Sequence, residues 1–406
     1  MKILCADALA PSLFEPLVSS GHEVLIEPDL TGETIPQRLT ELNPEVLVVR
    51  STKVTDDAIN ASPALGLVVR AGAGTDNVSK AAASAAGVYV CNVPGKNAIA
   101  VAELAMGLLL AIDRHIPAGM ADLANGQWNK ARYSKADGIY GKSLAIVGLG
   151  EIGFALAERA QAFGMSVNGL RKPGRSARSL RRIRAAGISL VDDLPTLLGD
   201  ADVVSIHVPK SPDTVGMVDA GFLAQMKDGA ILLNTSRGEV VNEGALIAAM
   251  DSRGILAGLD VWPNEPSSKE GEWSSPLSAH PNVVGSHHIG ASTAQAQSAV
   301  AEGTVEVITA YTEGRVVNCV NLMSESTGAA LLTVRHLDKV GVLAKIFESL
   351  RAAGLNVSQM DNEVFDGAVA AVASINVDAE PTEALLETLR QDADILDVSF
   401  ALLGAS

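Results

Sequence analysis

The strongest constraint on this chain is a glycine motif that lies between an apolar run and a helical pattern. The apolar run Ser143–Val147 leads into Gly148, Gly150 and Gly153, which have the spacing G-x-G-x-x-G. A strand that turns sharply into a helix leaves backbone N–H groups free at the helix N-terminus, where the helix dipole also favours an anion. The glycines permit the tight turn, the close approach of a pyrophosphate and the packing of helix on strand. The motif therefore predicts a dinucleotide-binding α/β fold in preference to a chance glycine turn.

Short apolar runs alternate with helical patterns on both sides of this motif, which predicts parallel sheets covered by helices. Two halves of this type predict two doubly wound, Rossmann-like domains. Residues 98–113 form a nearly uncharged helix, which we expect to be buried between domains or subunits. The expected strands cover residues 2–6, 23–26, 46–50, 67–71 and 88–91 in the first half, and residues 143–147, 166–170, 203–207, 230–234, 257–261 and 283–286 in the second.

The order of these elements divides the chain into three domains. We expect a discontinuous substrate domain, residues 1–94 and 286–315, around a dinucleotide-binding domain, residues 95–285. A linker, residues 316–328, leads to a third domain, residues 329–406. There the pattern of strand, helix, strand, strand, helix and strand predicts a βαββαβ ferredoxin-like module.

Composition narrows the class of protein. Apolar residues make up 48% of the 406 residues, and the net charge of −16 argues against a nucleic-acid partner. The cysteines Cys5, Cys91 and Cys319 are scattered, and the seven histidines show no metal-ligand spacing. No apolar run reaches transmembrane length. We therefore expect a reduced, cytoplasmic protein without a metal or a membrane partner, assembled as a homodimer or homotetramer.

Three polar residues, Arg237, Glu265 and His288, follow predicted strands of the second half. Ligands bind at the carboxyl ends of the strands in such a sheet. Removal of a hydride from an alcohol carbon requires a base for the hydroxyl proton, a cation for a neighbouring carboxylate and a group that orients the base. Singly, these residues are ordinarily a surface charge, a turn and a structural histidine. Together, on one dinucleotide-binding sheet, they predict a hydride-transfer site.

Four segments carry a resemblance to a known family: residues 148–153 (GLGEIG), 233–238 (LNTSRG), 258–266 (GLDVWPNEP) and 288–293 (HIGAST). On these segments the chain resembles the D-isomer-specific 2-hydroxyacid dehydrogenases. The resemblance runs through almost all of residues 1–315, so it implies a dehydrogenase with a nicotinamide cofactor.

The resemblance also implies roles for individual residues. Arg237 would bind the substrate carboxylate, Glu265 would polarise the imidazole, and His288 would be the acid or base. Cofactor contacts are implied at Gly148, Gly150, Glu151, Ile152, Gly153, His207, Pro209, Ser236, Asp260 and His288.

Within the family, residues 49–55, 69–77 and 92–97 are most similar to the branch that acts on a phosphorylated hydroxy acid. This implies oxidation of D-3-phosphoglycerate to 3-phosphohydroxypyruvate, the first step of L-serine biosynthesis. Such a substrate carries about three negative charges, so its pocket needs cations beyond Arg237. Predicted substrate contacts are Arg50, Lys53, Arg70, Gly72, Gly74, Asn97 and Arg132, the last of them able to come from a neighbouring subunit.

Two alternatives remain open. A glyoxylate or hydroxypyruvate reductase has a smaller substrate, which needs fewer cations than the cluster Arg50, Lys53 and Arg70. A non-catalytic, dinucleotide-sensing regulator could be built on the same fold, but it would be expected to add a peptide-binding or nucleic-acid-binding segment.

One departure from the family pattern concerns the second strand of the nucleotide-binding half. Residues 166–170 lead into Arg171 and Lys172, where NAD-specific members place an acid for the ribose hydroxyls. A guanidinium there binds a 2′-phosphate, with Lys172, Arg175 or Ser176 nearby. The sequence therefore predicts NADP use or relaxed specificity between NAD and NADP. The alternative is a solvated basic helix, because the run of arginines continues along the chain.

The C-terminal module resembles a second family, the ACT regulatory domains, in residues 336–344 and 354–357. This resemblance implies that paired modules bind an amino-acid effector such as serine. His336, Asp338 and Asn356 fall at the matching positions. The alternative is a module used only for assembly.

Overall fold

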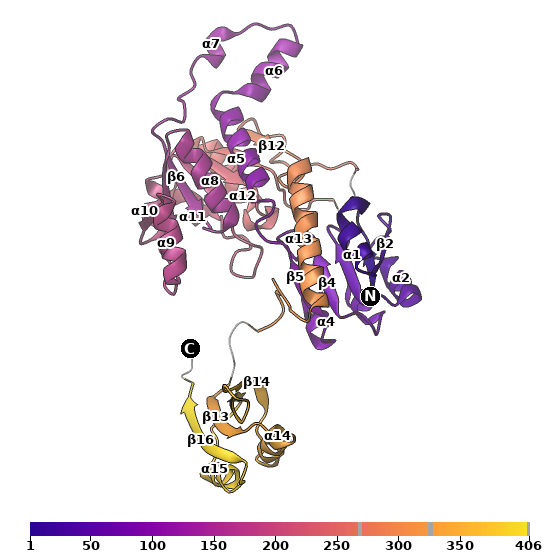
Figure 1. The fold of residues 1–406 in the computed structure, drawn as a ribbon. Helices are drawn as coiled ribbons and strands as arrows, with labels where there is room; N and C mark the ends of the chain where they lie inside the picture. Colours follow the sequence, from indigo (N-terminus) through magenta and orange to yellow (C-terminus); the bar gives the residue numbers. More distant parts are fainter. Residues whose placement is uncertain (267–269, 324–327, 404–406) are drawn as a thin grey trace. The chain divides into compact units, whose positions relative to one another are not determined.

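The computed structural model describes residues 1–266, 270–323 and 328–403. They form two compact units, Met1–Asn321 and a C-terminal unit that begins at Leu322 (Figure 1). The first unit contains two parallel sheets, and the second contains one antiparallel sheet.

The first sheet is built from the N-terminal residues and is covered by one later helix. Its elements are β1 (Lys2–Cys5), η1 (Pro11–Phe14), α1 (Glu15–Ser19), β2 (Glu23–Ile26), α2 (Ile35–Leu42), β3 (Val46–Val49), α3 (Asp56–Asn60), β4 (Leu67–Arg70), α4 (Lys80–Ala85), β5 (Tyr89–Asn92) and α13 (Ala294–Thr312). The parallel order β2-β1-β3-β4-β5 is flavodoxin-like. Alternate strand residues face opposite sides, so Val48 packs with Ile308 of α13 while Leu47 packs with Leu39 of α2. Helices on both faces explain why these short strands are almost entirely apolar.

The second sheet has seven parallel strands. Its elements and the flanking helices are α5 (Ala98–Asp113), α6 (Ile116–Ala124), α7 (Lys130–Tyr133), β6 (Ser143–Val147), α8 (Glu151–Ala162), β7 (Ser166–Leu170), α9 (Ala177–Ala185), β8 (Ser189–Val191), α10 (Leu194–Gly199), β9 (Val203–Ile206), α11 (Ala220–Gln225), β10 (Ile231–Asn234), η2 (Gly238–Val240), α12 (Glu243–Arg253), β11 (Leu256–Leu259) and β12 (Val283–Gly285). The order β12-β11-β10-β9-β6-β7-β8 is that of a doubly wound fold, the fold class that the sequence predicts. The predicted strands are confirmed, and β8 is an addition that the sequence did not reveal because it is short and has no fully buried residue.

The long apolar helix is confirmed as α5, with the predicted ends. It packs against α8 and against β10, β11 and β12, and it also contacts α13 of the first sheet. Its position between the two sheets explains why nearly every side of it is apolar. Within the described ranges, no helix is long and apolar enough to cross a membrane.

Helices α6 and α7 follow α5 as a projecting segment (Figure 1). Neither helix has a buried residue. Ile116, Met120, Leu123 and Trp128 are each more than half exposed. Exposed apolar side chains gathered in this way are typical of surfaces that bind another protein.

The described part of the C-terminal unit contains β13 (Ala330–Leu337), α14 (Val342–Ala352), β14 (Val357–Val364), β15 (Ala370–Val377), α15 (Glu383–Arg390) and β16 (Ile395–Leu402). The predicted βαββαβ order is confirmed, with the antiparallel strand order β14-β15-β13-β16. β13 extends as far as Leu337 and pairs with a strand on each side. β14 begins at Val357, and Gly354, whose φ is 71°, lies in the turn after α14.

The predicted linker, residues 316–328, begins inside the first unit. The backbone N–H of Asn92 donates to the Asn318 carbonyl at 3.1 Å, and that of Val320 donates to the Val90 carbonyl at 2.8 Å. This short pairing extends the sheet edge beside β5, so the first unit ends at residue 321. Residues 324–327 of the predicted linker lie outside the described residues.

Candidate active site

The glycine motif forms the turn between β6 and α8, at the point where the strand order reverses. Gly148 has a φ of 109°, and a Cβ there would lie 2.4 Å from the His207 carbonyl oxygen. A Cβ at Gly153 would lie 2.5 Å from the Gly148 carbonyl oxygen, whereas a Cβ at Gly150 would meet no atom within 4 Å. Packing therefore requires the first and third glycines, and the second leaves the N-terminus of α8 open to an anion. This cradle fits the pyrophosphate of a dinucleotide.

Gly150→Ala is expected to raise the Kd for the dinucleotide about tenfold, because the added methyl group keeps a phosphate from the backbone N–H groups and a charge-assisted bond of about 1.5 kcal/mol is lost. The melting temperature should stay unchanged, since the space beside Gly150 is open. Gly148→Ala is the matched comparison and should lower the melting temperature, because its methyl group meets backbone. Titration calorimetry and thermal unfolding measure the two effects, and equal dinucleotide affinity in Gly150→Ala and the parent protein contradicts the assignment.

Two residues predicted to contact the cofactor lie in the first turn of α8. The Glu151 carboxylate binds the guanidinium of Arg182 in α9 through both oxygens, so its side chain serves α9 and only its backbone N–H remains for an anion. Ile152 contributes through its backbone in the same way. Arg182 also stacks on the Phe154 ring at 4.1 Å, so this member of the arginine run has a structural role.

Arg171, at the end of β7, has a partner that the sequence did not reveal. Its Nε donates to Oδ1 of Asp192 at 2.6 Å, and both side chains are more than half exposed. Asp192 follows β8. The fold therefore places a carboxylate beside the end of β7, where the sequence has Arg171 in place of the acid that NAD-specific members have. Arg175 donates to the Leu170 carbonyl at 3.3 Å, and its buried Nε finds no partner in the described part of the chain. Lys172 is exposed.

The structure brings His288 and Glu265 together. Nδ1 of His288 lies 2.6 Å from Oε2 of Glu265, and Oε1 of Glu265 accepts the backbone N–H of Trp262 at 2.7 Å. The carboxylate makes Nδ1 the donor, which leaves Nε2 for a ligand. The hydrogen bond to Glu265 raises the pKa of His288 above its ordinary value, against an opposing effect of burial. The pair can therefore exchange a proton with a bound hydroxyl group.

Glu265→Gln is expected to move the pH dependence of the reaction to lower pH. The amide keeps a hydrogen bond to Nδ1 but removes the charge that raises the pKa of His288. Oxidation of a hydroxy acid needs neutral His288, so its rate rises as pH rises through that pKa. The acidic limb of kcat/KM should therefore lie at lower pH in the variant. An unchanged limb shows that Glu265 does not set the titration.

Asp260 holds the loop that carries His288. Its carboxylate accepts the hydroxyl of Ser286 at 2.7 Å and the backbone N–H groups of Ile289 and Gly290 at 2.8 Å each. The backbone N–H of His288, whose φ is 53°, donates to the Asp260 carbonyl at 2.7 Å. Asp260 is 1% exposed, so its carboxylate positions the loop, and its contact with the cofactor stays a prediction.

Arg237 follows a turn built by Asn234. Oδ1 of Asn234 accepts the N–H and the hydroxyl of Ser236 at 3.0 and 2.7 Å, and its Nδ2 donates to the Arg237 carbonyl at 2.9 Å. Nε of Arg237 donates to Oδ2 of Asp76 at 2.8 Å, and Nη1 donates to the Ser236 carbonyl at 2.7 Å. Nη2 has no hydrogen bond within the residues that the structure describes, so it remains for a substrate. Ser236, predicted to contact the cofactor, has its hydroxyl engaged in the turn.

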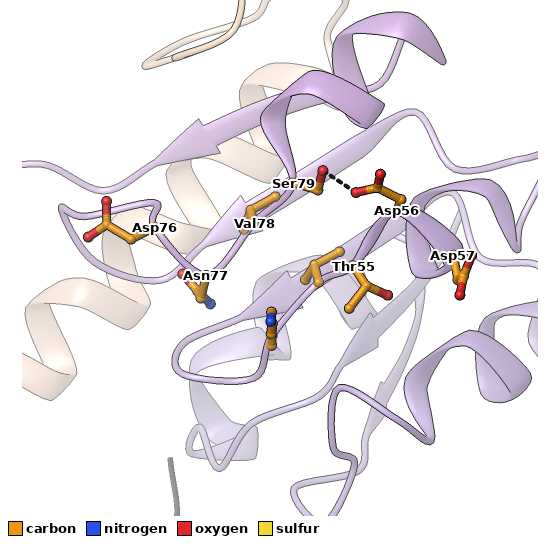
Figure 2. A pocket seen from close by; sticks show the side chains of 9 residues that line it. Thr55, Asp56, Asp57, Asp76, Asn77, Val78 and Ser79 are labelled. Atoms are coloured by element: carbon orange, nitrogen blue, oxygen red, sulfur yellow. Dashed lines mark hydrogen bonds between the residues drawn. The ribbon is translucent and has the colours of Figure 1, made fainter. Parts of the chain in front are cut away.

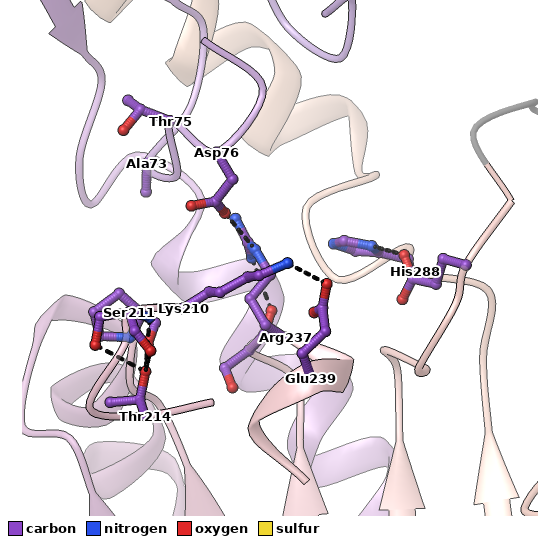
Figure 3. A network of polar contacts seen from close by, with 12 residues as sticks. Ala73, Thr75, Asp76, Lys210, Ser211, Thr214, Arg237, Glu239 and His288 are labelled. Carbon is purple, nitrogen blue, oxygen red and sulfur yellow. Dashed lines mark hydrogen bonds and ion pairs between the residues drawn. The ribbon is translucent and has the colours of Figure 1, made fainter. Parts of the chain in front are cut away.

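Figure 3 shows this group of side chains above the ends of the strands, with the His288 ring facing the side chains of Asp76, Arg237 and Glu239. Lys210 pairs with Glu239 there and adds a cation that the sequence did not single out. The charge of Arg237 lowers the pKa of His288, although less than Glu265 raises it. The predicted catalytic residues therefore share one site.

Arg70, at the end of β4, is partly buried beside two other arginines. Its Nε has no partner among the described residues. Burial, followed by the charges of Arg237 and Arg50, lowers the pKa of Arg70 to about 10. A Cβ at Gly72 would lie 1.9 Å from Nη1 of Arg70, and one at Gly74 would lie 2.1 Å from Nη2 of Arg237. Gly72 and Gly74 therefore make room for the two guanidinium groups, and their contact with a substrate stays a prediction.

The loop that carries Arg50 is held by Asp7, which the sequence did not single out. The Asp7 carboxylate accepts the backbone N–H groups of Arg50, Ser51 and Thr52 at 2.6, 3.2 and 3.2 Å. Asp7 is 7% exposed, so one buried carboxylate fixes the whole turn. The only signal in the sequence was its position just after a predicted strand.

Lys53 lines a hollow of about 350 Å³, which is shown in Figure 2. Asp56, Asp57 and Asp76 also line this hollow. Three carboxylates around one lysine disfavour an anion, so the predicted phosphate contact of Lys53 is not supported by its surroundings.

The last two predicted substrate contacts, Asn97 and Arg132, differ from each other in their surroundings. Asn97 begins α5, and its buried Oδ1 lacks a partner within the described ranges, so it is available to a ligand. Arg132 lies on α7, 61% of its side chain is exposed, and it pairs with Asp122 at 3.6 Å within the projecting segment. Arg132 therefore has no place in the arginine group of its own chain.

Two more buried polar atoms lack a hydrogen-bond partner within the described residues. They are Nδ1 of His207, which follows β9, and Oγ1 of Thr235, which follows β10. Nε2 of His207 lies 2.8 Å from the Ser205 hydroxyl, and burial lowers the pKa of His207 to about 4, so the ring is neutral. Unpartnered buried polar atoms require explanation, and a polar ligand supplies one. Pro209, two residues beyond His207, is exposed. Within the described ranges, no three His, Cys, Asp or Glu side chains are grouped as for a metal ion.

The C-terminal unit places its three candidate residues differently. His336 is 2% exposed, with Nδ1 2.8 Å from the Leu337 carbonyl and Nε2 3.0 Å from Oδ1 of Asn362. Its ring braces β13 to β14 across the sheet, which corrects the prediction of a direct effector contact. Asp338 and Asn356 are exposed and remain candidates.

Comparison with known proteins identifies a family. The family described as D-isomer specific 2-hydroxyacid dehydrogenase, NAD binding domain, matches residues 106–290. The chain is 39% identical over 336 residues to a D-3-phosphoglycerate dehydrogenase from Methanocaldococcus jannaschii. The matched residues make up 81% of this chain and 61% of the relative. It is also 40% identical over 302 residues to a hydroxypyruvate reductase from Thermotoga maritima. Here the matched residues make up 72% of this chain and 95% of the relative.

A solved structure shares the fold. A protein from Thermus thermophilus matches with a TM-score of 0.68 and 32% identity, over 79% of this chain and 100% of that chain. The chain spans about three fifths of the D-3-phosphoglycerate dehydrogenase and nearly all of the hydroxypyruvate reductase. The sequence similarity and the shared fold lead to one conclusion: the chain belongs to the D-isomer specific 2-hydroxyacid dehydrogenase family.

Proposed function

We propose that this chain oxidises D-3-phosphoglycerate to 3-phosphohydroxypyruvate with a nicotinamide dinucleotide, the first step of L-serine biosynthesis. The observation that carries the proposal is the partly buried Arg70, whose buried Nε has no partner among the described residues, beside Arg50 and Arg237. Three like charges held close together in a partly buried site favour an anion between them. A phosphorylated hydroxy acid supplies about three negative charges in a carboxylate and a phosphate.

The chemistry follows from the same residues. Nη2 of Arg237 binds the carboxylate, and Arg50 and Arg70 bind the phosphate. Glu265 keeps the proton on Nδ1 of His288, so Nε2 accepts the proton of the C2 hydroxyl. The dinucleotide, when bound, supplies the acceptor for the hydride. In the reverse direction, protonated His288 returns the proton to the oxo oxygen, and its raised pKa favours that form.

The second candidate function is that of a hydroxypyruvate reductase, because this chain matches almost the whole length of the relative with that name.

The two candidate functions are separated by following the absorbance of the reduced nicotinamide with 3-phosphohydroxypyruvate, hydroxypyruvate and glyoxylate in parallel. We expect kcat/KM for the phosphorylated substrate to be higher by at least about 100-fold, the worth of two charge-assisted bonds. Arg70→Met should reduce this preference while hydroxypyruvate turnover persists. Equal rates favour the reductase, and dinucleotide binding without any turnover favours a sensor.

We propose relaxed specificity between NAD and NADP. Arg171 can turn to a 2′-phosphate because its exposed pair with Asp192 contributes at most about 1 kcal/mol, while Asp192 can accept a hydrogen bond from a ribose hydroxyl.

Arg171→Asp is expected to raise the KM for NADPH at least about tenfold, because a guanidinium–phosphate bond is replaced by repulsion, with little change for NADH. Asp192→Asn is the matched variant and should improve NADPH use. Steady-state kinetics with both coenzymes provide the measurement. Failure of the parent protein to use NADPH at all rules out the proposed role of Arg171.

Regulation and assembly complete the proposal. The ferredoxin-like order of the C-terminal unit and the exposed Asp338 and Asn356 support an ACT-type module that binds an amino acid such as serine.

The apolar projecting segment α6–α7 supports a homodimer, in which Arg132 would reach the site of the neighbouring subunit. Serine inhibition that is lost in Asp338→Ala, and a dimer mass by light scattering, are the results expected.

A further inference from the structure

Cys91 and Cys319 face each other at the edge of the first sheet. Cys91 lies in β5, and Cys319 is its direct Cα partner in an antiparallel bridge. The backbone N–H groups of Asn92 and Val320 donate across this bridge at 3.1 and 2.8 Å. Both bonds flank the cysteines, so they form a non-hydrogen-bonded pair, in which Cα atoms are about 4.5 Å apart and side chains approach most closely.

This separation falls within the range of about 4.4–6.8 Å between Cα atoms that a disulfide requires. Neither cysteine is in a disulfide, and the Cys319 thiol donates to Oδ1 of Asn321 at 3.1 Å. Burial, followed by contact with the Cys319 thiol, raises the pKa of Cys91 to about 12. Cys91 is 1% exposed, whereas Cys319 is partly exposed. The two thiols therefore lie against each other, and a reagent reaches Cys319 first.

The third cysteine has no such partner. Cys5 lies in β1, and β3 and β4 separate that strand from β5. Three strand spacings amount to about 14 Å, twice the distance that a disulfide can bridge. Cys5 also donates to the Asp7 carbonyl at 3.3 Å in the buried sheet. It therefore serves as an internal control.

We propose that Cys91 and Cys319 are a modification site that forms an intramolecular disulfide with a low-molecular-weight disulfide as oxidant. The Cys319 thiolate attacks the oxidant, which gives a mixed disulfide and releases one thiol. Cys91 then loses its proton and attacks Sγ of Cys319, which releases the second thiol. Two protein thiols are oxidised and one disulfide is reduced to two thiols. The new bond fastens the segment 318–321, after which the second unit begins, to β5.

The test uses the full chain, oxidised glutathione and digestion with trypsin without reductant. We expect the peptide 81–96 joined to the peptide 316–335 in the monomer band of a non-reducing gel, and dithiothreitol should separate them. Cys319→Ser should abolish the linked peptide and Cys5→Ser should retain it. Oxidation should also raise the melting temperature of the parent protein by several degrees, but not that of Cys319→Ser.

Three outcomes overturn the proposal. A glutathione adduct that persists on Cys319 means that Cys91 cannot reach it. Peptides joined only in a dimer band mean that the bond forms between chains. Unmodified thiols after prolonged oxidation mean that the pair is inert.

Discussion

His288→Asn is expected to lower kcat/KM for 3-phosphohydroxypyruvate by about 10²–10⁴-fold, the usual contribution of a general acid or base. The amide cannot take or give the proton that Nε2 exchanges with the substrate oxygen. Asn is the informative replacement because His288 has a φ of 53°, a backbone conformation that Asn tolerates better than most residues. The loss therefore reports chemistry and not strain in the loop held by Asp260.

The control for His288→Asn is a substitution of the neighbouring histidine. His287 is the neighbouring residue, it is exposed, and no role follows for it from the geometry, so His287→Asn should leave kcat/KM within about twofold, as for an ordinary surface substitution. Dinucleotide affinity and melting temperature should be unchanged in both variants. Activity that survives in His288→Asn but is lost in His287→Asn moves the catalytic role to the other histidine.

Arg237→Met is expected to lower kcat/KM by about 10²–10³-fold, since charge-assisted bonds to the substrate carboxylate contribute about 1.5–3 kcal/mol each. The variant also loses the bond from Nε to Asp76 that joins the two sheets of the first unit. Arg237→Lys should recover part of the rate, because the charge returns without the planar fork. Removal of the charge should raise the pKa of His288, since Arg237 lowers it in the parent protein.

The matched control is Arg38, which has a similar side-chain exposure and pairs with Glu27 on the first sheet, outside the site. Arg38→Met should leave the kinetics unchanged. Kinetic measurements at several pH values separate the loss of binding from the change in titration. A rise in KM for hydroxypyruvate as large as that for the phosphorylated substrate locates Arg237 at the carboxylate, because both substrates have one. A loss confined to the phosphorylated substrate contradicts that role.

The parts that the sequence predicted are those with a local signal. Buried parallel strands are apolar runs, so β6 and β7 were predicted with the same ends that the structure has. The glycine motif specifies its own turn, because Gly148 and Gly153 have no room for a Cβ. Arg237, Glu265 and His288 follow strands, and the carboxyl ends of parallel strands converge at one edge.

The parts that it missed depend on contacts between distant residues. Asp76 and Arg237 are separated by 161 positions, and only the packing of the two sheets joins them. Asp192 reaches Arg171 from a strand too short to give a pattern. His336 matched a family position, but its burial in β13 depends on strands that pair with it from later in the chain. Carboxylates that position other groups have no motif of their own, so Asp7 was missed.

The most direct measurement follows a deuterium label from the reduced nicotinamide into the product of the purified chain. With 3-phosphohydroxypyruvate, the parent protein should give D-3-phosphoglycerate that carries deuterium at C2, while His288→Asn binds the dinucleotide but gives almost none. Dinucleotide binding by the parent protein without any label in the product would contradict the proposal that this site transfers a hydride.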